Sequence, residues 1–131
     1  MNKDLKYVAV DDDSFNNMLC TMIIEDTLGE EVDITTFTKP EEGLAFVKNV
    51  NGPTVLFLDI NMPTLSGWEF LELYDMFSEE VKTHLRIYML SSSLDQRDKD
   101  KASRNKYVNG FLSKPLESDA IMSIANGEFC S

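Results

Sequence analysis

The sequence is poor in basic residues. Its 131 residues include 12 lysines and arginines against 23 aspartates and glutamates, which gives a formal net charge of −11. This shortage of positive charge argues against binding to nucleic acid or to an anionic membrane surface, because both interactions depend on basic side chains. We therefore expect the binding partners to be proteins or cations.

Cysteine and histidine are also scarce. The two cysteines, Cys20 and Cys130, argue against a disulfide framework and favour a reducing compartment. His84 is the single histidine, so the sequence offers no second imidazole to chelate a metal with it. A signal-peptide pattern and an apolar run of membrane-spanning length are both missing. We therefore expect a cytoplasmic protein with one domain over residues 1–131, a length sufficient for its own core.

The most apolar stretch of the chain ends in an acidic residue. Residues Val55 to Leu58 lack the polar alternation of a half-exposed strand and so predict a buried strand of a parallel sheet. Asp59 follows directly, and Pro63 and Gly67 then turn the chain. In open α/β sheets, ligands bind at this carboxyl end of the strands. Asp59 is therefore a candidate nucleophile, metal ligand or helix cap.

Strand and helix patterns alternate five times along the chain. Strands are expected at residues 7–10, 32–37, 54–58, 85–90 and 109–113, each followed by a helix. This alternation predicts an α/β fold, a doubly wound five-stranded parallel sheet with right-handed crossovers and helices on both faces.

The expected helices differ in apolar character. One stripe in the first helix has the spacing of a buried face: Phe15, Met18, Leu19, Met22 and Ile23. A third helix is expected to continue from about residue 70 to 81, with Trp68 at its start as a packing residue. Ser92 and Ser93 are expected to cap the next helix, residues 95–106, whose polar sequence predicts weak packing and motion.

Three consecutive acidic residues follow the first strand. Asp11, Asp12 and Asp13 repel one another unless solvent or a cation lies between them. Asp13 or Ser14 can cap the following helix, whose N-terminus favours acidic side chains. Alternatively, the acidic residues can form a site for a hard cation. This cluster alone leaves both interpretations open.

Two other strand ends carry side chains suited to chemistry. Ser91 ends the fourth strand and Lys114 ends the fifth. Because parallel strands have their carboxyl ends at one edge of the sheet, we expect both residues to meet Asp11, Asp12 and Asp59 there. Clustered acids with a lysine suit Mg²⁺ and a phosphoryl group, with one carboxylate free to attack phosphorus.

The motifs at these strand ends resemble those of response-regulator receiver domains of two-component signalling. In chain order they are Val10-Asp11-Asp12, Leu58-Asp59-Ile60-Asn61-Met62-Pro63 with Gly67, Met89-Leu90-Ser91-Ser92, and Gly110-Phe111-Leu112-Ser113-Lys114-Pro115. The resemblance covers essentially the whole chain and implies a stand-alone receiver domain. It also implies a flavodoxin-like fold with strand order 2-1-3-4-5.

The resemblance implies a phosphoacceptor and a metal site. Asp59 is the implied phosphoacceptor. The implied direct ligands of Mg²⁺ are Asp12, Asp59 and the main-chain carbonyl of Asn61, while Asp11 acts mostly through water. Mn²⁺ or Ca²⁺ can substitute for Mg²⁺ in a crystal.

The same resemblance implies a switch. Lys114 is the implied salt-bridging lysine, and Lys114-Pro115 is a candidate cis peptide. Ser91 is expected to turn toward the phosphate and so make room for Phe111 to turn inward. Residues 95–106, with the fifth strand and the last helix, are the surface expected to signal phosphorylation.

The implied partners are proteins. A sensor histidine kinase or a histidine phosphotransfer protein donates the phosphoryl group, and a downstream protein target senses it. The resemblance implies a monomer or weak homodimer that is a phosphoacceptor and not an enzyme, although it assists its own phosphorylation and dephosphorylation.

Two competing functions remain. A Mg²⁺-dependent aspartyl phosphatase also places a nucleophilic aspartate after a strand, but such enzymes carry a second acid where this sequence has Asn61. A receiver that is never phosphorylated and acts only as a binding module is the other alternative.

Overall fold

The computed structural model describes residues 5–92 and 95–127. Its strands are β1 (Lys6–Val10), β2 (Asp33–Phe37), β3 (Thr54–Asp59), β4 (Leu85–Ser91) and β5 (Val108–Ser113). Its helices are α1 (Ser14–Leu28), α2 (Pro40–Lys48), α3 (Gly67–Tyr74), α4 (Glu79–His84), α5 (Gln96–Arg104) and α6 (Ser118–Ala125). Among these described residues, no helix has both the length and the apolar character needed to cross a membrane.

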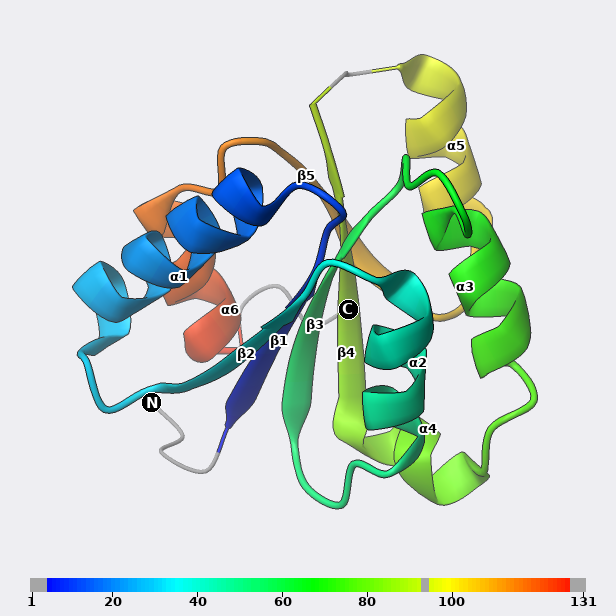
Figure 1. The fold of residues 1–131 in the computed structure, drawn as a ribbon, viewed down its shortest axis with the longest axis horizontal. Helices are drawn as coiled ribbons and strands as arrows, with labels where there is room; N and C mark the ends of the chain where they lie inside the picture. Colours follow the sequence, from blue (N-terminus) through cyan, green and yellow to red (C-terminus); the bar gives the residue numbers. More distant parts are fainter. Residues whose placement is uncertain (1–4, 93–94, 128–131) are drawn as a thin grey trace.

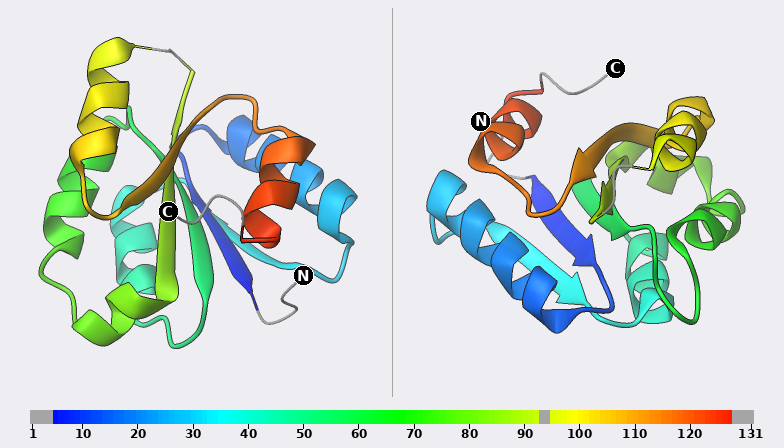
Figure 2. Two further views of the ribbon diagram at one scale, coloured as in Figure 1. Left: turned by 180° about the vertical axis from the view of Figure 1, so that it is seen from behind. Right: turned by 90° about the horizontal axis from the view of Figure 1, so that it is seen from above.

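The five strands form one sheet in the order β2-β1-β3-β4-β5, and every neighbouring pair is parallel. Helices α1 and α6 cover one face of the sheet, while α2, α3 and α5 cover the other (Figures 1 and 2). The predicted α/β class, strand order and two-sided helix arrangement are confirmed. The carboxyl ends of all five strands therefore lie at one edge.

The core has two halves, one on each face of the sheet, and alternate residues of a strand point into one half or the other. In β3, Val55 and Phe57 pack toward α1 and α6, while Leu56 and Leu58 pack toward α2, α3 and α4. Every residue of this strand is buried, as its continuous apolar run predicted. The strand that carries Asp59 is thus held rigidly from both sides.

The single helix expected over residues 70–81 is wrong. Helix α3 ends at Tyr74, and α4 begins at Glu79 after Ser78, whose hydroxyl accepts a hydrogen bond from the main-chain N–H of Val81. A good N-cap residue at this position stabilises a new helix start. The apolar spacing concealed the break because Tyr74 and Val81 are buried in the same half of the core.

The apolar stripe assigned to the buried face of α1 is wrong for three of its five residues, whereas Ile23 does pack against the core. Phe15 is 58% exposed, Met18 50% and Met22 52%. The buried residues of this helix are Asn17, Cys20 and Ile24, which follow an alternative stripe of similar spacing. Both faces of α1 carry apolar side chains, so periodicity could not identify the face that packs on the sheet.

Helix α5 is weakly anchored, as its polar sequence predicted. Ala102 is its one buried residue. The ammonium of Lys101 lies 5.0 Å from the ring centroid of Trp68, which packs against the core at the start of α3. The N-cap is Asp95 and not Ser92, because the Asp95 carboxylate accepts from the main-chain N–H of Arg97.

Two residues that the sequence analysis discussed lie outside the part of the chain that the structure describes. The expected cap at Ser93 and the tail cysteine Cys130 lie outside the described residues. Cys20, the other cysteine, is a buried free thiol. Helix α2 begins at Pro40, and Lys39 caps it without a side-chain hydrogen bond.

Candidate phosphoacceptor site

Four strands deliver polar side chains to one edge of the sheet. Asp11 directly follows β1, Asp59 ends β3, Ser91 ends β4 and Lys114 follows β5. In β1, β3 and β4 the residues just before these positions are buried and apolar, so the polar residue falls where the chain leaves the core. The convergence expected from the sequence is confirmed for Asp11, Asp59 and Lys114, since Lys114 contacts both acids.

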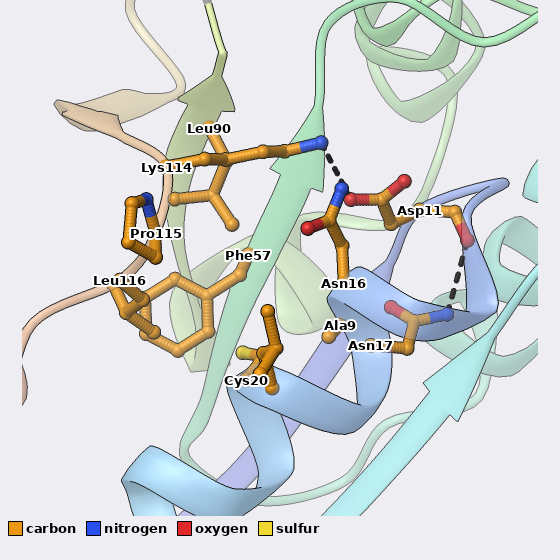
Figure 3. Close-up of a pocket in the computed structure, with 11 residues that line it drawn as sticks. Ala9, Asp11, Asn16, Asn17, Cys20, Phe57, Leu90, Lys114, Pro115 and Leu116 are labelled. Atoms are coloured by element: carbon orange, nitrogen blue, oxygen red, sulfur yellow. Dashed lines mark hydrogen bonds and ion pairs between the residues drawn. The ribbon is translucent and has the colours of Figure 1, made fainter.

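Lys114 bridges the two buried carboxylates. Its ammonium nitrogen lies 2.6 Å from Oδ2 of Asp11 and 3.2 Å from Oδ1 of Asp59. Figure 3 shows its side chain reaching from the end of β5 across to Asp11. Asp11 and Asp59 are 4% and 5% exposed, so water screens these charges poorly. One lysine therefore partly compensates two acids, and the site retains negative charge.

This residual charge affects protonation. Burial, with the repulsion from Asp11, raises the pKa of Asp59 to about 6, although Lys114 and the main-chain N–H of Asn61 act against the rise. Burial alone lowers the pKa of Lys114, but its bond to Asp11 and the charges of both acids raise it overall. A further cation at the site would relieve the repulsion and favour ionised Asp59.

The acidic cluster offers oxygen ligands to a cation. Carboxylate oxygens of Asp11, Asp12 and Asp59 all lie within 4.8 Å of one another. Oxygen donors of this kind are the ligands that Mg²⁺, Mn²⁺ and Ca²⁺ prefer, and the exposed Asp12 leaves room for retained waters. The acidic residues therefore fit a divalent metal. Asp13 belongs to the helix instead, since its carboxylate caps α1 at Phe15.

The loop after β3 is held close to the acceptor. The main-chain N–H of Asn61 hydrogen-bonds the Asp59 side chain, and the N–H of Gly67 donates to the carbonyl of Ile60 at 2.9 Å. A Cβ atom on Gly67 would lie 2.7 Å from the carbonyl oxygen of Asp59. Residue 67 must therefore be glycine. The metal contact that the resemblance implies for the carbonyl of Asn61 stays a prediction.

The two implied switch residues lie on neighbouring strands. Ser91 is fully buried and pairs with Ser113 across β4 and β5, and its carbonyl accepts from the N–H of Lys114 at 2.9 Å. Phe111 is partly buried against the core next to Met89. The Lys114-Pro115 peptide is cis, as the sequence suggested.

Asn17 is a residue at this site that the sequence analysis missed. It is 3% exposed, and its side-chain NH₂ donates to the carbonyl oxygens of Asp11 and Phe37 at 3.0 and 3.1 Å. These bonds join the ends of β1 and β2 just below the acidic cluster. The signal was present in the sequence, because Asn17 heads the stripe with Cys20 and Ile24 that is buried in α1.

Comparisons with known proteins agree with this geometry. A family model described as the response regulator receiver domain matches residues 8–126. A search of curated proteins finds no matching relative. Among solved structures, a two component response regulator from Cytophaga hutchinsonii is 31% identical with a TM-score of 0.86, the alignment covering 96% of this chain and 97% of that one.

Two further structures show the same fold. A response regulator receiver protein from Dyadobacter fermentans is 26% identical with a TM-score of 0.86, covering 97% of this chain and 99% of its own. The Vibrio cholerae chemotaxis protein CheY4 is 24% identical with a TM-score of 0.73, covering 94% and 97%. With the family model spanning both acidic strand ends and the terminal lysine, this chain belongs to the family of response regulator receiver domains.

Proposed function

We propose that Asp59 accepts a phosphoryl group in a Mg²⁺-dependent reaction, from a phosphohistidine of a sensor histidine kinase or histidine phosphotransfer protein. The observation that carries this proposal is the contact of one lysine with two buried acids, within reach of a third. A small phosphodonor can serve in place of a protein. The reaction modifies the chain itself, so we do not propose an enzyme that turns over separate substrates.

The transfer can be written from the side chains present. An oxygen of ionised Asp59 attacks phosphorus, the bond from phosphorus to the donor's imidazole nitrogen breaks, and that nitrogen keeps the electron pair. Lys114 lies 3.2 Å from the attacked carboxylate and can follow the charge onto a phosphoryl oxygen. A bound Mg²⁺ would neutralise charge on the phosphoryl group and the acids.

We further propose that the signal leaves through α5, β5 and α6. Ser91 would hydrogen-bond the phosphoryl group, and Phe111 would turn into the space behind it. Support comes from the weak anchoring of α5, which follows β4 and holds a single buried residue. A downstream protein would then recognise the repacked surface.

Phosphorylation by acetyl phosphate tests the acceptor assignment. With Mg²⁺ present, we expect the mass of one phosphoryl group to be added to the wild-type protein and to Asp26→Asn, an exposed acid on α1. Asp59→Asn should gain none, and a chelator should abolish the reaction. Unchanged labelling of Asp59→Asn would exclude the proposed acceptor. Sustained hydrolysis of added phosphoesters would instead favour the phosphatase alternative.

A further inference from the structure

Strand β5 contains one residue more than the stretch of β4 that it pairs with. Val108 of β5 pairs with Ile87 of β4. The next residue of β4, Tyr88, pairs with Gly110, so Asn109 is left over between the two pairs. An extra residue of this kind is a β-bulge, which bends the strand and changes where the following side chains point.

The bulge lets two apolar residues of β5 face the same half of the core. Val108 and Phe111 both pack against the half that α2, α3 and α4 cover, although residues three apart point to opposite faces of a regular strand. A regular strand continuing from Val108 would place Phe111 beside Leu90, on the face that α1 and α6 cover. Lys114 would then lie one residue further from Ser91, whose carbonyl now accepts the N–H of Lys114 at 2.9 Å.

The side chain of Asn109 holds the bulge in place. Its Oδ1 atom accepts a hydrogen bond from the main-chain N–H of Ile87 at 2.9 Å. Strand N–H groups ordinarily donate to main-chain carbonyls of the neighbouring strand, and a bulge disrupts that ladder. An asparagine amide oxygen accepts from a main-chain N–H much as a peptide carbonyl does. The half-buried Asn109 therefore supplies an acceptor to β4 at the residue where the register shifts.

Strand β5 lies at the edge of the sheet, so only its ladder with β4 sets its register. Its start is also held from α3. The hydroxyl of Tyr107, the residue before β5, donates to the carboxylate of Asp75, and the Tyr107 ring packs edge-on against Tyr74. Its far end is held by the bond from the N–H of Lys114 to β4. Asn109 takes up the one residue by which these two attachments differ.

We propose that Asn109 is a positioning residue that fixes the register of β5, and with it the places of Phe111 and Lys114. The importance of those two residues rests on the proposed function, in which Phe111 is part of the switch and Lys114 holds the phosphoryl group. The register itself belongs to the unphosphorylated protein. Measurements made without a phosphodonor therefore test the register separately from the proposed function.

Asn109→Asp and Asn109→Ala form a matched pair. Asn109→Asp keeps a side-chain oxygen at the same distance from the main chain, whereas Asn109→Ala removes it. Nuclear Overhauser effects between the Phe111 ring and the Met89 methyl group, which belong to paired residues on one face, should appear in the wild type and in Asn109→Asp. They should fall by about half in Asn109→Ala, as part of the population slips by one residue. Amide exchange at Ile87 should quicken about fivefold in Asn109→Ala alone.

Phosphorylation by acetyl phosphate reports on the place of Lys114. Its rate should fall about fivefold in Asn109→Ala, because a displaced ammonium stabilises the transferred group less well. Asn109→Asp should keep a rate close to that of the wild type, which makes it the conservative rescue.

Asn105→Ala is the control. The side chain of Asn105 also accepts one main-chain N–H at 2.9 Å, that of Tyr107, but it lies before β5 and outside the bulge. Loss of either side-chain bond should lower the urea midpoint of unfolding by a similar amount. The contacts of Phe111 and the phosphorylation rate should change in Asn109→Ala alone. Equal changes in both variants would mean that Asn109 acts only through stability, and would overturn the proposal.

The contacts of Phe111 decide the remaining outcomes. Their persistence at full strength in Asn109→Ala would overturn the proposal, and so would their loss in Asn109→Asp. If the wild type accepts no phosphoryl group, the proposed function fails, and these contacts still decide the register. If Asn109→Ala does not fold, Asn109→Gln replaces it, because its longer side chain moves the acceptor away from Ile87. Unchanged contacts of Phe111 in Asn109→Gln would then overturn the proposal.

Discussion

Asp59 is the residue whose environment conflicts most with its charge. It lies at the end of a strand buried on both sides, beside a second buried acid, and shares one lysine with it. Burial and like charge both disfavour the ionised carboxylate. This position presents a carboxylate oxygen to a phosphodonor. In the metal-free protein, however, ionised Asp59 lowers the free energy of unfolding.

This conflict predicts a pH dependence. The pKa of Asp59 is raised from 3.8 to about 6, so the folded protein binds more protons than the unfolded chain between these values. Stability of the metal-free protein should therefore fall as pH rises from 4 to 6. Asp59→Asn removes this effect and should be more stable than the wild type by about 3 kcal/mol at pH 7, measured by urea unfolding.

The advantage of Asp59→Asn should shrink toward pH 4, where the folded wild-type carboxyl is protonated and the unfolded one, with a pKa of 3.8, is close to half protonated. Asp26→Asn is the control, since this exposed acid on α1 lies outside the site. An equal gain for Asp26→Asn would mean that net charge, and not the environment of Asp59, causes the effect. A gain independent of pH would contradict the raised pKa.

Individual residues also show where sequence reasoning stops. Asp11, Asp59, Ser91 and Lys114 were predicted to share one edge because parallel strands fix where their ends lie. The role of Asn17 was not predicted, because its partners are main-chain carbonyl oxygens. Every residue carries such an oxygen, and only the fold decides which of them lie near Asn17. The sequence could show that Asn17 lies in a stripe that α1 buries, but not which carbonyls its side chain would meet.

At the scale of elements, α1 is the clearest failure of periodicity. Two apolar stripes of similar spacing run along it, and the one that includes Phe15, Met18 and Met22 is exposed. Its first member is joined to the acidic site, because the N–H of Phe15 donates to Asp13 and the N–H of Asp13 donates to Asp11. The phosphodonor protein proposed above would therefore approach Asp59 beside this stripe.

We therefore expect the exposed face of α1 to contact the protein phosphodonor. Met18→Ala should slow phosphotransfer from the cognate donor about fivefold, because truncating a contacting apolar side chain costs about 1 kcal/mol of binding. Rates with acetyl phosphate should be unchanged, since a small donor needs no docking surface. The measurement is transfer from the labelled donor protein.

Met76→Ala is the matched control for this prediction. Met76 is also an exposed methionine, 83% accessible, but it follows α3 on the opposite side of the sheet. Similar slowing of phosphotransfer in Met18→Ala and Met76→Ala would show that the donor protein does not bind specifically at α1.

Helix α5 is the second informative element. Ala102 is its one buried residue, so the contact of Lys101 with Trp68 is a notable part of its attachment. An exposed cation–π contact stabilises by about 0.5–1 kcal/mol. Lys101→Gln should therefore speed amide hydrogen exchange in residues 96–104 about two- to fivefold, measured by NMR.

Lys99→Gln is the control, because Lys99 is exposed on the same helix and carries the same charge. Faster exchange in both variants would assign the effect to helix charge. No change in Lys101→Gln would mean that the contact with Trp68 contributes nothing to holding α5.

At the scale of the whole molecule, the sheet was more predictable than the helices around it. Strand direction follows from the alternation of strands and helices and from crossover handedness, which act over the entire chain, whereas the strand order was implied by the resemblance to receiver domains. The break between α3 and α4 and the exposed face of α1 depend on local competition between caps and on which of two apolar faces packs better. These differences of a few kcal/mol are decided only in the assembled core.

The global stability of the molecule should respond to Mg²⁺. A ligand that binds the folded state at about ten times its dissociation constant stabilises it by about 1.4 kcal/mol. For a domain of this size the melting temperature should rise by about 5 °C. Neutralising Asp12, an exposed member of the acidic cluster, by Asp12→Asn should remove most of this rise without disturbing the core. KCl at equal ionic strength controls for screening. If Mg²⁺ raises the melting temperature of Asp12→Asn as much as that of the wild type, the ion binds elsewhere. The carboxylates of Asp11, Asp12 and Asp59 would then not form the metal site that stabilises the protein.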